Sequence, residues 1–372
     1  MVSITVEEDS NVATIAETTQ AIIGTTAATT IIGSMSSMPS SSGNSIWILV
    51  NQIQLILLLP MLNTYTEYKF RSYVKNFEFA SMNFGFLRSS YSWPFLDSQI
   101  KKLDYEQAEM VFKDNGIESG SFLYNHYGFV KAIITMTLLN LIYVVLKFTI
   151  FKELSQRNVI KKCLKFISKF LHFTIYVRLF IEALLFMFIS SMLEISQLDS
   201  FINNLASYII SCFSLLFICM LVSLIVIHFF KFRRNSIEGS KYFEELYEGT
   251  KNKPVPKLYT FIFIFRRAIS ALSLVILRSL NVWIRCISFT SIQLASAIFT
   301  IVVKPFDSTK DNIIEVLNEV IFLILCIIIT ICNNESLWFP SLSHVLISIM
   351  LANNVIIFSL IFAIVIVHFL IL

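Results

Sequence analysis

The chain has 372 residues, of which 56% are hydrophobic and 15% are charged, and its mean hydropathy is +0.72. This composition is typical of a membrane protein with several spans and excludes a soluble globular domain. The formal net charge of +4 is too small to indicate nucleic-acid binding, and the sequence holds no nucleic-acid-binding motif. The six cysteines form no close ligand pair, so we expect neither a metal site nor a cofactor.

Residues 1–45 form a Ser- and Thr-rich polar segment that contains no Lys or Arg. The absence of a basic start argues against a secretory signal peptide, and the composition predicts a flexible chain. Within this segment, residues 12–35 are apolar enough to cross a membrane weakly, although Glu17 and several threonines make a crossing marginal. Two interpretations, with and without a span here, therefore stay open.

Eight apolar runs follow in the transmembrane region at residues 46–372, and each is close to the roughly 20 residues that a helix needs to cross a bilayer. Runs of this length without strict alternation predict helices and not β-strands. The predicted fold is an all-α transmembrane bundle with eight spans, or nine if residues 12–35 also cross. The predicted spans cover residues 45–62, 128–151, 174–193, 208–230, 258–277, 282–303, 314–331 and 345–372.

The charges of the loops predict the orientation of these spans. Segments 152–172 and 231–257 are rich in Lys and Arg, so both are expected on the cytoplasmic side. Loops 194–207 and 333–344 have no Lys or Arg and are expected outside, and Asn334 begins a glycosylation sequon in the second loop. The C-terminus then ends inside, and the side of the N-terminus depends on the number of spans.

Residues 63–127 are expected to form a small extracellular cap between the first two predicted spans. Aromatic residues are dense between positions 77 and 95, which favours a packed core over an exposed sugar-binding platform. Because so short a segment rarely folds alone, we expect the cap to pack on the outer ends of the helices.

The cytoplasmic segment 152–172 has a pattern of its own. Apolar residues recur there at helical spacing opposite a row of lysines, which predicts an amphipathic helix lying in the membrane interface. Anionic lipids of the inner leaflet are the expected partner, and capture by a calmodulin-like protein is the alternative. The lysines are Lys161, Lys162, Lys165 and Lys169.

Charged residues inside predicted spans are candidates for function, because lipid does not accommodate an unpaired charge. Asp311, Glu315 and Glu319 follow one another at four-residue spacing and therefore share one helix face. Arg266 and Arg267, in an earlier span, are the expected cationic partners. We predict that both arginines pair with Glu315 and Glu319 in an interhelical clamp at the inner leaflet. A cation site linked to permeation and a proton relay are the alternatives.

Two further polar sets lie in predicted spans. Arg178 and Glu182 are four residues apart in the third span and are expected to satisfy each other. Asn318, Asn353 and Asn354 belong to the last two spans, where they either line a pore or form interhelical hydrogen bonds. The loop between these spans holds no glycine and a single acidic residue, which is unlike a cation selectivity filter.

Several short motifs follow one another in a distinctive order. They are Trp47 to Pro60 with Asn51 and Gln54, Phe77-Glu78-Phe79, Asn83-Phe84-Gly85-Phe86-Leu87, Ser121-Phe122-Leu123-Tyr124-Asn125, Leu258-Tyr259, Arg266-Arg267, Lys304-Pro305-Phe306, Asp311-Asn312, and Glu315 to Asn318-Glu319. Together they resemble the membrane region of a group of ciliate-type polytopic proteins with a TRP-like (transient receptor potential), polycystin-related C-terminal transmembrane domain. This resemblance implies a cation channel or a channel-like subunit.

The expected function is therefore a TRP-like cation channel or channel-like subunit in an integral membrane, with inorganic cations, membrane lipids and a second copy of the chain as partners. The alternatives are a non-conducting scaffold or receptor remnant, and a lipid-handling protein of scramblase or transporter type. The sequence holds no nucleophile elbow, P-loop, paired-histidine metal helix or dinucleotide fingerprint, so no enzymatic activity is expected.

Overall fold

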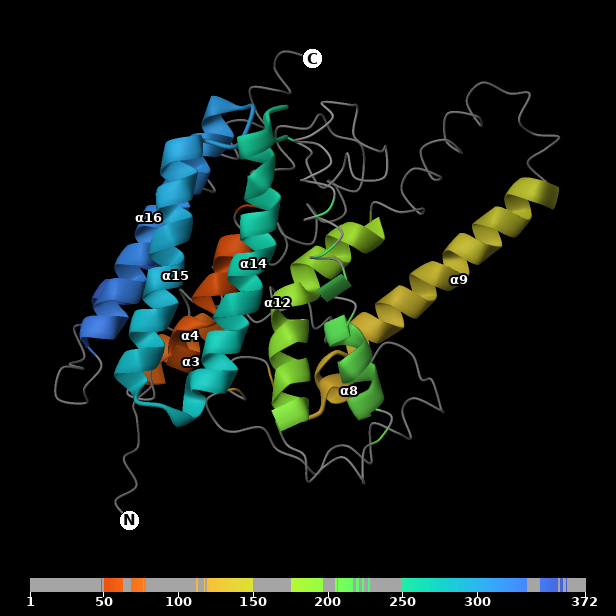
Figure 1. The fold of residues 1–372 in the computed structure, drawn as a ribbon, viewed down its shortest axis with the longest axis horizontal. Helices are drawn as coiled ribbons and strands as arrows, with labels where there is room; N and C mark the ends of the chain where they lie inside the picture. Colours follow the sequence, from red (N-terminus) through yellow and green to blue (C-terminus); the bar gives the residue numbers. More distant parts are fainter. Residues whose placement is uncertain are drawn as a thin grey trace.

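The computed structural model describes residues 50–62, 68–75, 119–149, 175–196, 207–216, 249–332 and 342–353, together with isolated positions between them. All regular structure in these residues is helical (Figure 1), which confirms the predicted all-α class. The described elements are α3 (Leu59–Leu62), α4 (Tyr68–Lys75), α8 (Phe122–Asn125), α9 (Tyr127–Thr149), α12 (Ile175–Ser196), α14 (Pro254–Ile276), η5 (Leu277–Ser279), α15 (Val282–Val303) and α16 (Thr309–Ile331).

Four of the described helices are long and apolar enough to cross a membrane, namely α9, α14, α15 and α16. They correspond to the predicted spans at 128–151, 258–277, 282–303 and 314–331, and they indicate a membrane-embedded protein. The other four predicted spans overlap shorter apolar helical stretches at residues 50–62, 183–196, 207–216 and 342–353. The predicted number of eight or nine spans is therefore not confirmed.

The turn between α15 and α16 follows from a few residues with special roles. Lys304 ends α15 in a left-handed conformation with φ of 48°, and the proline that follows cannot continue the helix. The Asn312 side chain accepts a hydrogen bond from the Phe306 N–H and donates one to the Phe306 carbonyl. Ser308 then caps α16 by accepting from a backbone N–H of its first turn. These contacts fix where the acidic face of α16 begins.

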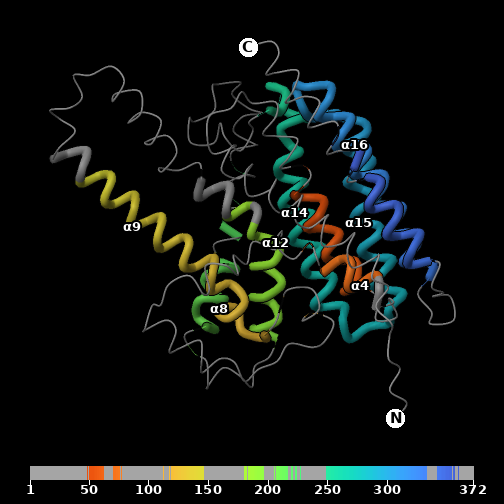
Figure 2. Tube along the Cα trace, turned by 180° about the vertical axis from the view of Figure 1, so that it is seen from behind, coloured from red at the N-terminus to blue at the C-terminus, as the bar shows by residue number. Residues whose placement is uncertain are grey.

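Helices α14, α15 and α16 pack together, and α15 runs antiparallel to both α14 and α16 (Figures 1 and 2). Their connections are short, which is the usual arrangement for antiparallel neighbours. α12 packs against α14, while α9 points away from the group in both views. The site described below lies among the three antiparallel helices and the segments that contact them.

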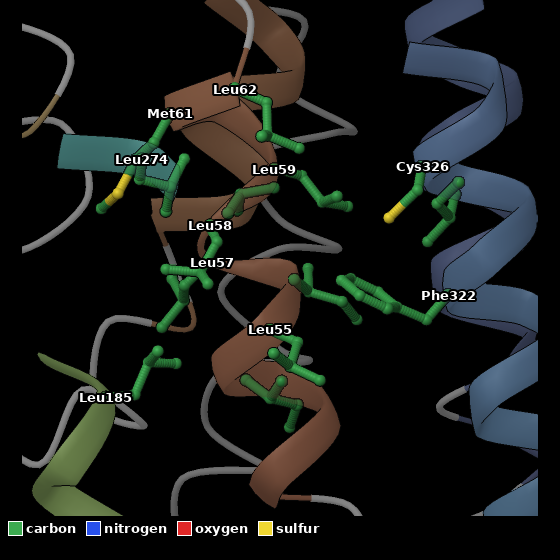
Figure 3. Close-up of a cluster of buried hydrophobic side chains, with 14 of the residues drawn as sticks. Leu55, Leu57, Leu58, Leu59, Met61, Leu62, Leu185, Leu274, Phe322 and Cys326 are labelled. Carbon is green, nitrogen blue, oxygen red and sulfur yellow. The ribbon is translucent and has the colours of Figure 1, made fainter. Parts of the chain in front are cut away.

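Residues 50–62, which we call the core segment, lie inside this arrangement. Every residue of the segment from position 52 onward is buried. Figure 3 shows Leu185 and Leu274 of α12 and α14 on one side of the segment, and Phe322 and Cys326 of α16 on the other. From position 55 to position 62 the segment is apolar around its whole circumference, as expected for a helix enclosed by other helices. The segment predicted as the first span is therefore a central packing element that does not face outward.

The three antiparallel helices carry apolar side chains outside and polar side chains inside. Phe265, Ile298 and Ile324 are more than 40% exposed, whereas Arg267 and Gln293 are at most 1% exposed. A protein surrounded by water has the opposite distribution, but lipid favours apolar outer faces and directs polar groups to the interior. This distribution agrees with a membrane environment for the bundle.

Candidate functional site

The Arg266 guanidinium joins all three antiparallel helices. Its Nε donates to Oε1 of Gln293 on α15 at 2.5 Å. Its Nη1 donates to Oγ of Ser296 at 3.1 Å and forms an ion pair with Oε1 of Glu319 on α16. The ring centroid of Phe322 lies 5.8 Å from Cζ and covers the cation. The buried Arg266 side chain therefore forms one ion pair, two further hydrogen bonds and one contact with an aromatic ring.

This cluster lies halfway along the helices that form it. Arg266 is 12 residues from the first residue of α14 and 10 from the last, which corresponds to about 18 Å and 15 Å at the helical rise. Glu319 has the mirror position in α16, 10 residues from its start and 12 from its end. The predicted topology had placed the pair toward the inner leaflet, whereas along α14 and α16 themselves the pair lies near the middle of each helix.

Arg267 is directed into a different contact from its neighbour. Its Nη1 donates to the Ile181 carbonyl of α12 at 2.7 Å, and its Nη2 donates to the side-chain oxygens of Asn51 and Gln54 in the core segment, each at 2.5 Å. The Phe263 ring centroid lies 4.2 Å from its Cζ. The expectation that both arginines serve the acids of α16 is therefore corrected, because successive helical residues point about 100° apart.

Glu315, one turn before Glu319, accepts a hydrogen bond from the Tyr259 hydroxyl at 2.5 Å. The Tyr259 and Phe306 rings pack in a T-shaped arrangement, with ring centroids 5.1 Å apart. The four residues predicted as one clamp therefore enter three separate sets of contacts. Tyr259 was not among the predicted site residues, although its position seven residues before Arg266 places both on one face of α14.

Gln293 and Ser296 were also absent from the predicted site. Their signal in the sequence is weak, because a Gln and a Ser among apolar residues of a span are not charged. In the structure Gln293 is fully buried and its amide also donates to Ser270 Oγ at 3.0 Å. Gln293 therefore extends the hydrogen-bond network of Arg266 to Ser270, a second residue of α14.

A second buried cluster consists of three amides, which we call the amide cluster. Gln52 of the core segment donates to the Asn318 carbonyl at 3.4 Å. The Asn353 side chain donates to Gln52 Oε1 at 3.2 Å and to Asn318 Oδ1 at 3.4 Å. The structure thus brings together Asn318 and Asn353, which the sequence had proposed as pore-lining or interhelical residues. Hydrogen bonds of this kind connect helices in lipid.

Several buried polar atoms of these clusters have no hydrogen-bond partner. An unpaired buried group carries its full desolvation cost. Arg266 Nη2 and Asn318 Nδ2 are such donors, and Glu319 Oε2 and Asn353 Oδ1 are such acceptors.

The Ser-Phe-Leu-Tyr-Asn motif at 121–125 forms the short helix α8, with Ser121 at its N-cap, directly before α9. Asn125 Oδ1 accepts from the Ser119 N–H at 3.0 Å, and its Nδ2 donates to the Ser119 carbonyl at 2.6 Å. The Phe122 N–H donates to Oε2 of Glu194, near the end of α12, at 3.0 Å. The motif therefore fixes the start of α9 to α12, which is a structural role.

His126 follows α8 directly, at its C-cap. Its Nε2 lies 3.1 Å from Ser190 Oγ of α12, and the side chain is only 2% exposed. Burial lowers the pKa of His126 to about 4, and a backbone hydrogen bond with Phe186 opposes this shift without cancelling it. The imidazole is therefore neutral at pH 7.

The remaining predicted residues lie outside the described ones. These are the side chains of Arg178 and Glu182, the lysines Lys161, Lys162, Lys165 and Lys169, the sequon at Asn334, and Asn354, together with residues 1–45 and 152–172. Within the described part of the chain, no group of three or more His, Cys, Asp or Glu side chains is arranged to hold a metal ion.

No protein-family model, no curated protein and no solved structure matches this sequence. The interpretation of the site therefore depends on its geometry. Chemically, the arrangement offers a buried ion pair, a second carboxyl group beside a tyrosine hydroxyl, and neutral amide oxygens. Such groups can hold helices together, accept a proton, or replace the hydration shell of a small cation.

Proposed function

We propose that the chain is a multi-pass membrane protein that acts as a TRP-like cation channel or channel-like subunit. The observation that carries this proposal is the polar network of Arg266, Gln293 and Glu319 halfway along three apolar helices. Polar and ionisable groups at this depth are costly, and in membrane proteins they mark ion pathways and the elements that control them.

Within this proposal the Arg266–Glu319 pair is the clamp that holds the helices in one arrangement. Breaking a buried ion pair by removal of one partner costs about 3–5 kcal/mol, so a shift of α16 past α14 that separated the pair would be strongly opposed. A conformational change that opened a path would therefore have to keep the pair or exchange its partners. Glu315 lies one turn before Glu319 on the same helix, so it is the carboxylate that can replace Glu319 as the partner of Arg266.

The amide cluster supports cations as the permeant species. Gln52, Asn318 and Asn353 bring neutral oxygens together between separate segments, and neutral oxygens can take the place of water around a monovalent cation. The order of motifs that resembles the TRP-like group supports the same class.

The experiment is ion-current recording from the purified full chain in planar lipid bilayers with a sodium or potassium gradient. We expect a cation-selective conductance whose ion preference changes in the Asn353→Leu variant and not in the outward-facing control Ile324→Ala. Absence of current from protein that elutes as a folded species would contradict the proposal and favour a non-conducting scaffold. Lipid scrambling by the same purified chain in lipid vesicles, without current in planar bilayers, would favour a lipid-handling protein.

A further inference from the structure

The acidic residues of α16 form a row that runs from the start of the helix to its middle. Asp311, Glu315 and Glu319 are 2%, 7% and 6% exposed and lie on the buried face of the helix. The eight residues from the first to the last acid correspond to about 12 Å along the axis. The row therefore leads from the turn at 304–308 to the Arg266 cluster.

Glu315 and Glu319 differ in the charge of their partners. Glu319 is neutralised by Arg266. Glu315 accepts a hydrogen bond from the Tyr259 hydroxyl, which is a neutral donor. Among the described residues, no Lys, Arg or His nitrogen lies within salt-bridge distance of Glu315, and Arg266 forms its ion pair with Glu319.

The charged groups that surround Glu315 make a carboxylate unfavourable there. Asp311 and Glu319 lie one turn away on the same helix, and α14 contributes Tyr259 and Arg266. The side chains from α15 that join the Arg266 cluster are neutral. A buried carboxylate between two other acids, with the nearby cation already paired, is stabilised by taking up a proton.

We propose that Glu315 is a proton-binding site that exchanges its proton with water at the 304–308 end of the bundle. In release, the O–H bond of the acid breaks, its electron pair stays on the carboxylate, and a water molecule takes the proton to become hydronium. Uptake is the reverse. The inference goes beyond the proposed function, because a proton site can exist in a protein that conducts no other ion.

A second observation supports proton binding in this row. Glu319 Oε2 is buried and has no hydrogen-bond partner, although Oε1 of the same carboxylate is paired with Arg266. The free carboxylate oxygen is a proton acceptor one turn deeper than Glu315. In this row, protonated Glu315 is the proton donor, and Glu319 Oε2 is the proton acceptor one turn further along the helix.

The test is infrared difference spectroscopy of the full chain in lipid nanodiscs, which detects the C=O stretch of a protonated carboxyl group. We expect this band at neutral pH, a shift of the band on transfer to D₂O, and its loss in Glu315→Gln. The control Asp307→Asn removes an exposed acid of the adjacent turn and should leave the band intact.

Tyr259→Phe provides a second readout that does not require removal of the acid. Loss of the tyrosine hydrogen bond should move the C=O band to higher frequency while the protein stays folded. The proposal is overturned if no such band exists at neutral pH, if Glu315→Gln leaves it unchanged, or if the band of the folded Tyr259→Phe variant does not move. None of these results depends on current, so they are separate from the test of conduction.

Discussion

Neutralising Glu319 tests whether the Arg266–Glu319 pair holds the bundle together. In Glu319→Gln the guanidinium keeps its contacts with Gln293 and Ser296 but loses its counter-ion. We expect a loss of about 3 kcal/mol in the free energy of unfolding, at the lower end of the range for a broken buried pair. Arg266→Gln removes all of these contacts and leaves a buried carboxylate, so a loss of about 4–5 kcal/mol is expected.

The double variant Arg266→Gln with Glu319→Gln decides between pairing and independent effects. Two amides of similar size carry no net charge, so the double variant should cost only about 1–2 kcal/mol, less than either single change. The coupling free energy would then be at least about 5 kcal/mol. The assay is reversible unfolding in lipid bicelles, with outward-facing Ile324→Ala as the control for general loosening. Additive costs, or a Glu319→Gln variant within about 0.5 kcal/mol of the wild type, would refute the clamp.

Three further predictions follow from the same contacts. The swap Arg266→Glu with Glu319→Arg should recover part of the folded yield that Arg266→Glu alone loses, whereas Arg267→Glu with Glu319→Arg should recover none, as measured by the monodisperse fraction in gel filtration. Asn353→Leu should lower the free energy of unfolding by about 1 kcal/mol, the usual size of an interhelical hydrogen bond in lipid, and the bicelle assay should detect it. The His126 pKa of about 4 lies below the unfolded value of about 6.5, so the unfolded state takes up a proton first as the pH falls. Stability should therefore decrease between about pH 6.5 and pH 4, by about 3 kcal/mol in total, and a pH series of melting curves should lose this decrease in His126→Gln.

Several features of the fold were predictable because they depend on local patterns. The predicted span 282–303 has the bounds of α15, since an apolar run flanked by Asn281 and Lys304 determines both ends of a helix. The spacing of Asp311, Glu315 and Glu319 placed them on one face of α16, and all three are buried there. The predicted spans in α14 and α16 begin four or five residues after the helices do. The first turns of these helices contain polar residues, so they lie outside the apolar runs from which the spans were predicted.

The amino-acid sequence by itself determined that this is an all-helical, membrane-embedded protein with charged residues in its spans, because composition and the 3.6-residue period depend on the chain alone. Only the tertiary structure decided that Arg266 pairs with Glu319 while Arg267 contacts the core segment, and that Tyr259 is the partner of Glu315. Adjacent residues on a helix point in different directions, and which neighbour each one meets depends on how the helices pack. The partner of a buried charge is therefore a property of the assembled bundle.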